Sequence, residues 1–296
     1  MAQILITGTS SGIGLAAALE LGRAGHRVYA TMRNPARSPA LAQAVEREGL
    51  PVTIHRMDVD SDLSVAECFG ELRGQGVSID VLVNNAGIER HGSTEELPMD
   101  DVRAIMETNY FGAIRCIRQA AAAMRERRSG CIVNVSSVAG KISSSPLGYY
   151  AASKFALEAV SEALAQEMKP FGVRVAIVEP GIIDTPMAHA IETAPPSLYP
   201  HARHLAAMFR AALGQPTPPT TVAAVIRHIV ESGTGQLRHP AGPDAAPFLA
   251  WRAAMTDEQW IAFNALDDEA YREAVKRDFG LEIEIAPSAQ AAAAAD

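Results

Sequence analysis

Short apolar runs alternate along the chain with stretches in which apolar residues recur every three or four positions. Several runs are rich in Val and Ile and apolar on both faces, as in "IDVLV", "CIVNVS" and "VRVAIV", which is typical of buried parallel strands. The longer stretches have the period of helices. We predict strands over 3–7, 27–32, 52–57, 80–84, 130–136 and 174–179, and helices over 13–24, 38–48, 61–74, 99–126 and 150–169.

This alternation predicts an α/β fold with a doubly wound parallel sheet, that is, a Rossmann fold. Strand, helix and strand repeated many times require crossovers that cover both faces of the sheet with helices. In such folds the ligand crevice lies at the carboxyl ends of the strands. Residues that follow the predicted strands are therefore the first candidates for a functional site.

After residue 180 the regular rhythm ends. Proline clusters in 181–219 predict a mobile lid over the substrate, with one short helix near 201–213, and a further helix is predicted at about 220–232. Residues 245–280 carry aromatic residues at helical spacing and predict a helical C-terminal extension, which covers either the core or a subunit contact. We expect one domain over 1–285 and a disordered Ala-rich tail over 286–296.

Composition is that of a globular protein that stays in solution. Of the 296 residues, 48% are hydrophobic and 20% are charged, and the net charge is -8, which argues against a protein that coats nucleic acid or anionic membranes. No apolar run is long enough to span a bilayer, and we see no signal peptide.

Three cysteines without CxxC spacing predict reduced core thiols in the cytoplasm. His201 and His204 lack a third ligand type nearby, so we expect no metal site.

A glycine-rich turn, Thr7-Gly8-Thr9-Ser10-Ser11-Gly12-Ile13-Gly14, follows the first predicted strand and opens the first helix. Glycines at such a turn let the backbone approach a pyrophosphate, and the helix N-terminus favours its negative charge. The spacing is GxxxGxG rather than GxGxxG, so the general dinucleotide fingerprint does not strictly apply. Taken alone, the turn could also be purely structural.

Further polar motifs follow in order along the chain. All of them except Asn109, which lies within a predicted helix, fall at or just beyond the carboxyl end of a predicted strand. Tyr150 and Lys154 are four residues apart at the start of a helix, so they share one face. The full set is Asn84-Asn85-Ala86-Gly87, Asn109, Ser136, Ser137, Tyr150, Lys154, Pro180-Gly181 and Thr185.

Over about 1–240, this ordered set of motifs resembles the short-chain dehydrogenase/reductase family. The resemblance implies a Rossmann-type domain that binds NAD or NADP and a Ser-Tyr-Lys centre with an assisting Asn, matched here by Ser137, Tyr150, Lys154 and Asn109. It also implies that the glycine turn holds the phosphates, that Asp58 contacts adenine, and that Thr185 binds the nicotinamide amide. The expected cofactor site comprises Gly8, Ser10, Ser11, Gly12, Ile13, Gly14, Arg33, Asp58, Val59, Asn85, Ala86, Gly87, Tyr150, Lys154, Pro180, Gly181 and Thr185.

Two assignments need a choice between neighbours. Tyr149 has Ser153 one helical turn on, which supplies no charge, whereas Tyr150 has Lys154, so we assign catalysis to Tyr150. The family's spacing selects Ser137 as the catalytic serine. For Ser136 we expect a hydroxyl that bonds backbone at a strand end.

The chemistry of these residue types is consistent with proton transfer. A free Tyr phenol has a pKa near 10, and a nearby Lys ammonium and an oxidised nicotinamide favour the phenolate. Tyr150 can then act as general acid in reduction and general base in oxidation. Ser137 would hold the substrate oxygen and Lys154 the nicotinamide ribose. The resemblance further implies that Asn109 holds a water linking Lys154 to solvent.

The end of the second predicted strand indicates NADP(H) rather than NAD. NAD-specific relatives place an acidic residue there to bind the adenine ribose, but in "HRVYATMRN" the position is Met32. The next residue, Arg33, offers a forked guanidinium suited to a 2′-phosphate, and Ser10 or Ser11 could add a hydroxyl donor. Arg33 could alternatively be a solvated loop arginine.

Within the family, "ATxRN" and the C-terminal extension resemble the branch that contains hydroxysteroid and retinol dehydrogenases. This predicts an NADP(H)-dependent oxidoreductase that interconverts a carbonyl and a secondary alcohol on a small, lipophilic substrate. The alternatives are a non-catalytic NADP-binding sensor, an NAD-dependent alcohol dehydrogenase, and a nucleotide-sugar epimerase or dehydratase, whose typical GxxGxxG is absent. The family resemblance also implies a homodimer or homotetramer.

Overall fold

The computed structural model describes residues 1–193 and 197–287. Its centre is one seven-stranded sheet in the order β3-β2-β1-β4-β5-β6-β7, and every neighbouring pair of strands is parallel. From β1 the chain adds β2 and β3 toward one edge of the sheet, and then β4 to β7 toward the other edge. The point between β1 and β4 at which the strand order reverses is where an α/β fold opens its ligand crevice. The strands are β1 (Gln3–Thr7), β2 (Arg27–Met32), β3 (Val52–Arg56), β4 (Val81–Asn84), β5 (Gly130–Val135), β6 (Val173–Pro180) and β7 (Arg238–Ala241).

Helices connect the strands and continue beyond the sheet. Short 3₁₀ turns cover Pro35–Arg37, Val138–Gly140 and Lys169–Phe171. The α-helices are α1 (Gly12–Arg23), α2 (Pro39–Glu48), α3 (Asp62–Gly74), α4 (Met99–Met106), α5 (Gly112–Glu126), α6 (Gly148–Met168), α7 (Pro186–Ile191), α8 (His201–Leu213), α9 (Pro219–Ser232), α10 (Ala245–Ala253), α11 (Asp257–Asn264) and α12 (Asp268–Phe279).

The sheet has a hydrophobic core on each face, as a doubly wound fold requires. Ile4 and Ile6 of β1 pack in a cluster with side chains of α1, α2 and α9. Leu5, between them, joins the opposite cluster with residues of α3, α5 and α6. Because successive side chains of a strand point to opposite faces, a continuous apolar run such as "ILI" supplies both cores. The predicted fold class is confirmed.

One strand of the sheet and one connecting helix differ from the prediction. The strand β7 (Arg238–Ala241) was not expected, because "RHPA" has neither an apolar run nor an alternating pattern. Among the described strands it pairs only with β6, and Pro240, which has no N–H to donate, is tolerated at such an edge position. The helix expected over 99–126 is interrupted by a π-helical turn over Glu107–Phe111.

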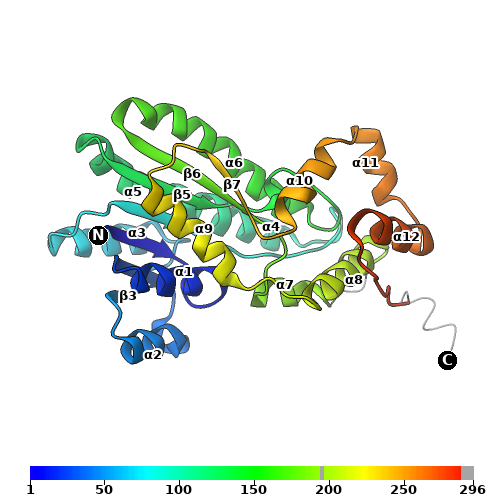
Figure 1. Ribbon diagram of the computed structural model, residues 1–296, viewed down its shortest axis with the longest axis horizontal. Helices are drawn as coiled ribbons and strands as arrows, with labels where there is room; N and C mark the ends of the chain where they lie inside the picture. The colour runs from blue at the N-terminus through cyan, green and yellow to red at the C-terminus, as the bar shows by residue number, and fades with distance from the viewer. Residues whose placement is uncertain (194–196, 288–296) are drawn as a thin grey trace.

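The segments after the sheet gather at one end of the molecule. Figure 1 shows α10, α11 and α12 beside α8 at that end, while α9 returns to lie along α1. The lid, 181–219, holds α8 at the expected position and also the shorter α7, which was not predicted. The expected disordered tail, 286–296, lies outside the described residues from 288 onward.

None of the helices in the described ranges is both long enough and apolar enough to cross a membrane. The three cysteines, Cys68, Cys116 and Cys131, are buried and unpaired, as expected of core thiols. Burial raises the pKa of each thiol, to about 12 for Cys116, which keeps these side chains protonated and unreactive.

Candidate active site

The glycine-rich turn lies against the end of β4 so closely that side chains would not fit. A Cβ atom on Gly14 would lie 2.2 Å from the Gly8 carbonyl oxygen, and one on Gly8 would lie 2.7 Å from the Ala86 Cα. Gly8 also has a φ of +71°, which glycine adopts without strain. Packing and backbone conformation therefore both explain the glycines at these positions.

Asn85 ties the turn to the central strands. Its Nδ2 donates to the carbonyl oxygens of Thr7 at 2.9 Å and Gly8 at 3.0 Å. In return, the Thr7 hydroxyl accepts from the backbone N–H groups of Asn85 and Ala86 at 3.0 and 2.9 Å. These bonds join the carboxyl ends of β1 and β4, so the glycine turn has a fixed position at the crevice.

A polar cleft opens at this edge of the sheet, and most of the predicted cofactor residues line it. Gly14 does not, because it is packed behind the turn, and Pro180 and Gly181 instead line a neighbouring cavity. The predicted residues that border the cleft are Gly8, Ser10, Ser11, Gly12, Ile13, Arg33, Asp58, Val59, Asn85, Ala86, Gly87, Tyr150, Lys154 and Thr185.

The donor groups of this cleft fit the phosphates of a dinucleotide. α1 opens onto the cleft at Gly12, and its N-cap residue, Ser11, makes no capping bond with its own side chain. Met32, the last residue of β2, lines the cleft and presents no acceptor. Arg33 beside it is exposed and forms no ion pair with any residue in the described ranges. A phosphate at this end of the cleft would find a cation and a helix N-terminus.

Lys154 is buried between the cleft and the sheet. Its side chain extends from α6 to the end of β5, where Nζ donates to the Val135 carbonyl oxygen at 3.0 Å. Burial lowers the pKa of the ammonium to about 8, and the negative charge of Glu158 partly opposes this shift. An ammonium with a single bond to protein has donors left for a ligand in the cleft.

Tyr150, one helical turn before Lys154, stands at the border of the cleft and a second cavity. Burial raises the pKa of its phenol, a hydrogen bond with Ser137 opposes the increase, and the charge of Glu89 adds to it. The phenol is therefore protonated at neutral pH and able to donate a proton. The neighbouring Tyr149 instead donates to the Thr94 carbonyl oxygen at 2.9 Å, away from both cavities.

The two serines after β5 differ from the expectation in one respect. The Ser137 hydroxyl accepts from the Ala139 N–H at 3.1 Å and caps the short 3₁₀ turn, and it lines the second cavity with Tyr150. The prediction that the Ser136 hydroxyl bonds backbone is wrong. That hydroxyl is buried without a partner among the described residues and borders both cavities.

Asn109 lies in the π-helical turn and lines neither cavity. Its Oδ1 accepts from the Ile88 N–H at 2.8 Å, and its Nδ2 donates to the Ile88 carbonyl oxygen at 2.9 Å and to the Ser153 hydroxyl at 3.0 Å. The wider π turn inserts one residue into the helix, and such bulges frequently occur at functional sites. Asn109 thus fixes the segment after β4 against α6.

The second cavity is an apolar pocket beside Tyr150. Residues of the lid, such as Met187, Leu205 and Met208, form one part of its wall. The C-terminal extension forms another part, with Trp251 and Trp260 among its side chains. Ring centroids of these two tryptophans are 5.6 Å apart at 80°, an edge-to-face contact that is favourable for aromatic pairs. The aromatic residues predicted to cover the core or a subunit contact therefore build a pocket.

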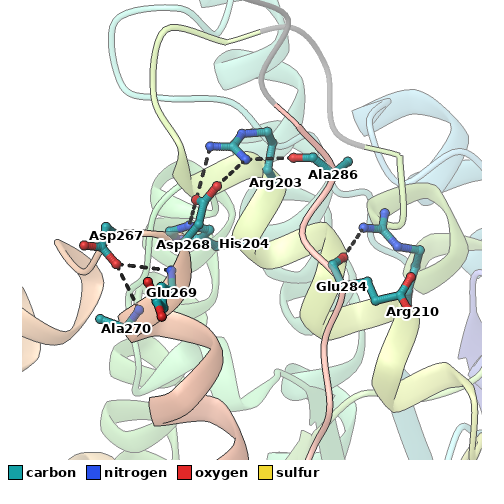
Figure 2. Close-up of polar contacts among 9 residues, drawn as sticks. All are labelled: Arg203, His204, Arg210, Asp267, Asp268, Glu269, Ala270, Glu284 and Ala286. Carbon is teal, nitrogen blue, oxygen red and sulfur yellow. Dashed lines mark hydrogen bonds and ion pairs between the residues drawn. The ribbon is translucent and has the colours of Figure 1, made fainter. Parts of the chain in front are cut away.

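Polar contacts fasten the C-terminal extension to the lid, as Figure 2 shows. Asp268 of α12 accepts from Arg203 Nη1 at 2.9 Å and pairs with His204 Nε2 at 2.7 Å, both on α8. Arg203 Nη1 also donates to the Ala286 carbonyl oxygen at 2.7 Å, so the first residue of the expected disordered tail is held. The Arg210 guanidinium donates to the Glu284 carbonyl oxygen at 3.1 Å.

Two acidic residues that line the cavities, Asp60 and Glu89, were not predicted. "MDVD" contains two aspartates, and only Asp58 was chosen, although Asp60 also lines the cleft, where Oδ1 is buried without a partner in the described chain. Glu89 was missed because the sequence alone does not distinguish a buried acidic residue in a loop from a solvent-exposed one.

The described residues contain no cluster of three or more side chains arranged to hold a metal ion.

Comparison with known proteins agrees with this geometry. A model of the short chain dehydrogenase family matches residues 2–196. Retinol dehydrogenase 8 of Homo sapiens is 41% identical over 186 residues, which cover 62% of this chain and 59% of the relative. The 3-ketodihydrosphingosine reductase of Bacteroides thetaiotaomicron is 37% identical over 182 residues, covering 62% and 64%. The chain thus matches less than two thirds of the length of these relatives.

Solved structures extend the likeness over the whole fold. A short-chain dehydrogenase from Streptomyces avermitilis superposes with a TM-score of 0.74 and 32% identity, covering 93% of this chain and 97% of that one. Actinorhodin polyketide ketoreductase, solved with NADPH, gives a TM-score of 0.71 and 28% identity over 81% and 95% of the two chains. With the cleft and the family match, these likenesses show that the chain belongs to the short chain dehydrogenase family of oxidoreductases.

Proposed function

We propose that this protein is an NADP(H)-dependent oxidoreductase that interconverts a carbonyl and a secondary alcohol on a lipophilic substrate. The observation that carries the proposal is the position of Tyr150, which borders both the polar cleft and the apolar pocket. A proton donor at that border can reach a substrate oxygen while the cofactor lies on the other side. When bound, the nicotinamide would supply or accept the hydride.

Each catalytic residue has a defined part in this proposal. Tyr150 donates its phenolic proton to the carbonyl oxygen in reduction and takes it back in oxidation. Ser137 lies beside the phenol and holds the substrate oxygen. Lys154 favours the phenolate through its positive charge and donates its remaining N–H groups toward the cleft. Asn109 positions the segment after β4 and, by the same proposal, lies on the route by which the proton is replaced.

Two observations support NADP(H) over NAD. Met32 occupies the position at which an acidic side chain would bind ribose hydroxyls. Arg33 follows it at the rim of the cleft, exposed and without an ion pair among the described residues. A 2′-phosphate would give this guanidinium a partner.

The composition of the pocket supports a lipophilic substrate. Most of its wall is apolar, including Ile142, Leu147, Met208, Phe209 and Trp251, and burying hydrocarbon there stabilises the complex by about 25 cal/mol per Å². The names of two relatives include retinol and 3-ketodihydrosphingosine as substrates, both largely hydrocarbon. A non-catalytic NADP-binding sensor remains the alternative, and turnover decides between the two.

The test is the consumption of NADPH and, separately, of NADH with a panel of steroids, retinals, quinones, aldehydes and β-keto esters. We expect turnover of bulky apolar carbonyl compounds with a preference for NADPH. Tight NADPH binding with no turnover of any compound would favour the sensor. A preference for NADH would contradict the cofactor assignment.

Further expectations from the sequence stay proposals. We propose one domain over 1–285, a cytoplasmic location, no nucleic-acid partner, and a homodimer or homotetramer. Light scattering coupled to size-exclusion chromatography would measure the oligomeric state, and a monomer would contradict it. Fractionation of the source cells would test the location.

A further inference from the structure

Glu89 is a buried carboxylate in the wall of the apolar pocket. Its side chain is 4% exposed, and Oε2 lies 3.3 Å from His91 Nδ1. The other oxygen, Oε1, is buried and has no hydrogen-bond partner among the described residues. A buried acceptor without a partner is unfavourable. A ligand whose donor group bonds this oxygen would therefore be stabilised in the pocket.

The backbone around Glu89 is held on both sides. Asn109 bonds both the N–H and the carbonyl oxygen of Ile88, the preceding residue. Arg90 Nη1 donates to the Glu89 carbonyl oxygen at 2.8 Å. His91 restrains one carboxylate oxygen. The unpartnered oxygen is therefore presented by a fixed segment, as a binding group must be if it is to select among ligands.

Glu89 and Asp244 are the carboxylates of the pocket, and no Lys or Arg is found among the described residues of its wall. The wall also holds His201 and His204, and burial lowers the pKa of His204. Asp244 Oδ2 accepts from the Ile182 N–H at 2.7 Å, while Oδ1 has no partner in the described chain. Such a pocket disfavours substrates that carry a carboxylate or phosphate and favours a cation.

Glu89 lines the same pocket as Tyr150, the proposed proton donor. Its charge contributes to raising the pKa of the Tyr150 phenol. A negative group here opposes the phenolate that oxidation needs. A positive group on the substrate, placed next to Glu89, would cancel that opposition only when the substrate is bound.

We propose that Glu89 is a specificity-determining residue that binds a protonated amine on the substrate, close to the carbon that is oxidised or reduced. The substrate class is then an amino ketone or amino alcohol with a hydrocarbon body, which occupies the rest of the apolar pocket. This inference rests on the proposed function for the reaction, but the binding of an ammonium by Glu89 can be measured without turnover.

The two tryptophans of the chain, Trp251 and Trp260, both line the pocket, so intrinsic fluorescence reports its occupation. The experiment titrates the NADP-loaded protein with octylammonium, 1-octanol and octanoate, which differ only in the head group. We expect octylammonium to bind about ten- to a hundredfold more tightly than octanol, the range for a charge-assisted hydrogen bond, and octanoate to bind most weakly.

Three variants test the residue. Glu89→Gln keeps the shape and should reduce the preference for octylammonium to about that of octanol. Glu89→Asp keeps the charge and should retain part of the preference, which shows that the pocket is still folded. Asp100→Asn is the matched control, because it also removes one negative charge but its side chain is 96% exposed. The control should bind all three ligands as the wild type does.

Binding of octanoate as tight as that of octylammonium, or an unchanged preference in Glu89→Gln, would overturn the proposal. Turnover then separates it from the proposed function. With NADPH, wild type should reduce a long-chain 2-amino ketone with a kcat/KM at least tenfold above that of the ketone without the amine. If both ketones are reduced at equal kcat/KM, the role of Glu89 is contradicted but the proposed function is not. If no carbonyl compound is reduced while the binding of octylammonium still depends on Glu89, the proposed function is contradicted but the role of Glu89 is not.

Discussion

The ammonium nitrogen of Lys154 lies 5.7 Å from the ring centroid of Tyr150, and its hydrogen bond with the Val135 carbonyl oxygen holds it there. The two side chains leave α6 one turn apart, so the helix itself sets their spacing. In the proposed mechanism the positive charge favours the phenolate of Tyr150, whereas burial of the phenol disfavours it. The predictions below follow from this pair and from the groups around it.

Tyr150→Phe should lower kcat by about 10²- to 10⁴-fold, the usual contribution of general acid catalysis, and should leave NADP binding nearly unchanged. The reason is that phenylalanine keeps the ring and loses only the proton donor. Steady-state kinetics and NADPH fluorescence titration measure the two effects. Tyr149→Phe is the matched control and should keep most of the activity, because Tyr149 bonds the Thr94 carbonyl oxygen outside both cavities. The opposite pattern would show that the assignment is wrong.

Arg33→Ala should weaken NADP binding about ten- to a hundredfold and leave NAD binding almost unchanged, since a hydrogen bond with a charged group contributes about 1.5–3 kcal/mol. Arg37→Ala is the matched control, because Arg37 is exposed but does not line the cleft. Dissociation constants from calorimetry give the comparison. An equal loss for both cofactors, or a wild-type preference for NAD, would contradict the role of Arg33.

Lys154 should make the unliganded protein more stable at high pH. Because its folded pKa of about 8 is below its ordinary value of 10.5, the unfolded chain binds more protons between these two values, and stability rises with pH across that window. The gain is about 3 kcal/mol from pH 8 to 10.5, at 1.36 kcal/mol per pKa unit. Chemical denaturation of wild type and Lys154→Met measures it. A stability difference between them that does not change with pH would count against the shift.

Glu179 should make the free energy of unfolding decrease with rising pH in the acidic range, the opposite of the effect of Lys154. It is 2% exposed on β6, and burial, followed by the charge of Glu158, raises its pKa from 4.5 to about 7. The folded state then binds more protons than the unfolded chain between pH 4.5 and 7, so stability falls as pH rises through that window, by about 3 kcal/mol at most. Glu179→Gln should remove this fall in denaturation curves. Parallel curves for the two proteins would exclude it.

The backbone amide protons of the lid should exchange with solvent more slowly when ligands bind. We expect slower hydrogen exchange over 185–215 with NADP and a substrate analogue than without them, and equal protection in both states would contradict closure. Asp268→Ala should speed exchange in α8, because Asp268 bonds Arg203 and His204. Asp257→Ala is the control, since Asp257 pairs with Arg252 inside the C-terminal extension and should leave α8 unchanged.

The local sequence pattern was enough to predict six of the seven strands and most of the residues that line the cleft. Buried parallel strands are continuous apolar runs, and the glycine turn and Asn85 follow such runs directly, so their place at one sheet edge follows from topology. The helical period was enough to predict that Tyr150 and Lys154 lie on one face of a helix. These features depend on neighbours in the sequence.

Features that depend on distant contacts could not be predicted. The short strand β7 forms because β6 offers an open edge, not because "RHPA" favours a strand. Asn109, in the π turn, bonds Ile88 and Ser153, which lie 21 positions before it and 44 positions after it. The pocket that Glu89 lines includes lid and extension residues more than a hundred positions later, such as Leu205 and Trp251.

The two cavities are completed at different times during synthesis. Every residue that lines the polar cleft lies between Gly8 and Met187, whereas the apolar pocket needs side chains as late as Phe279. Because chains are made from the N-terminus and tend to fold in that order, a ribosome-bound intermediate can contain Tyr150 and the nucleotide turn before the C-terminal part of the pocket wall has been synthesised. Selectivity is thus the last property that the growing polypeptide acquires.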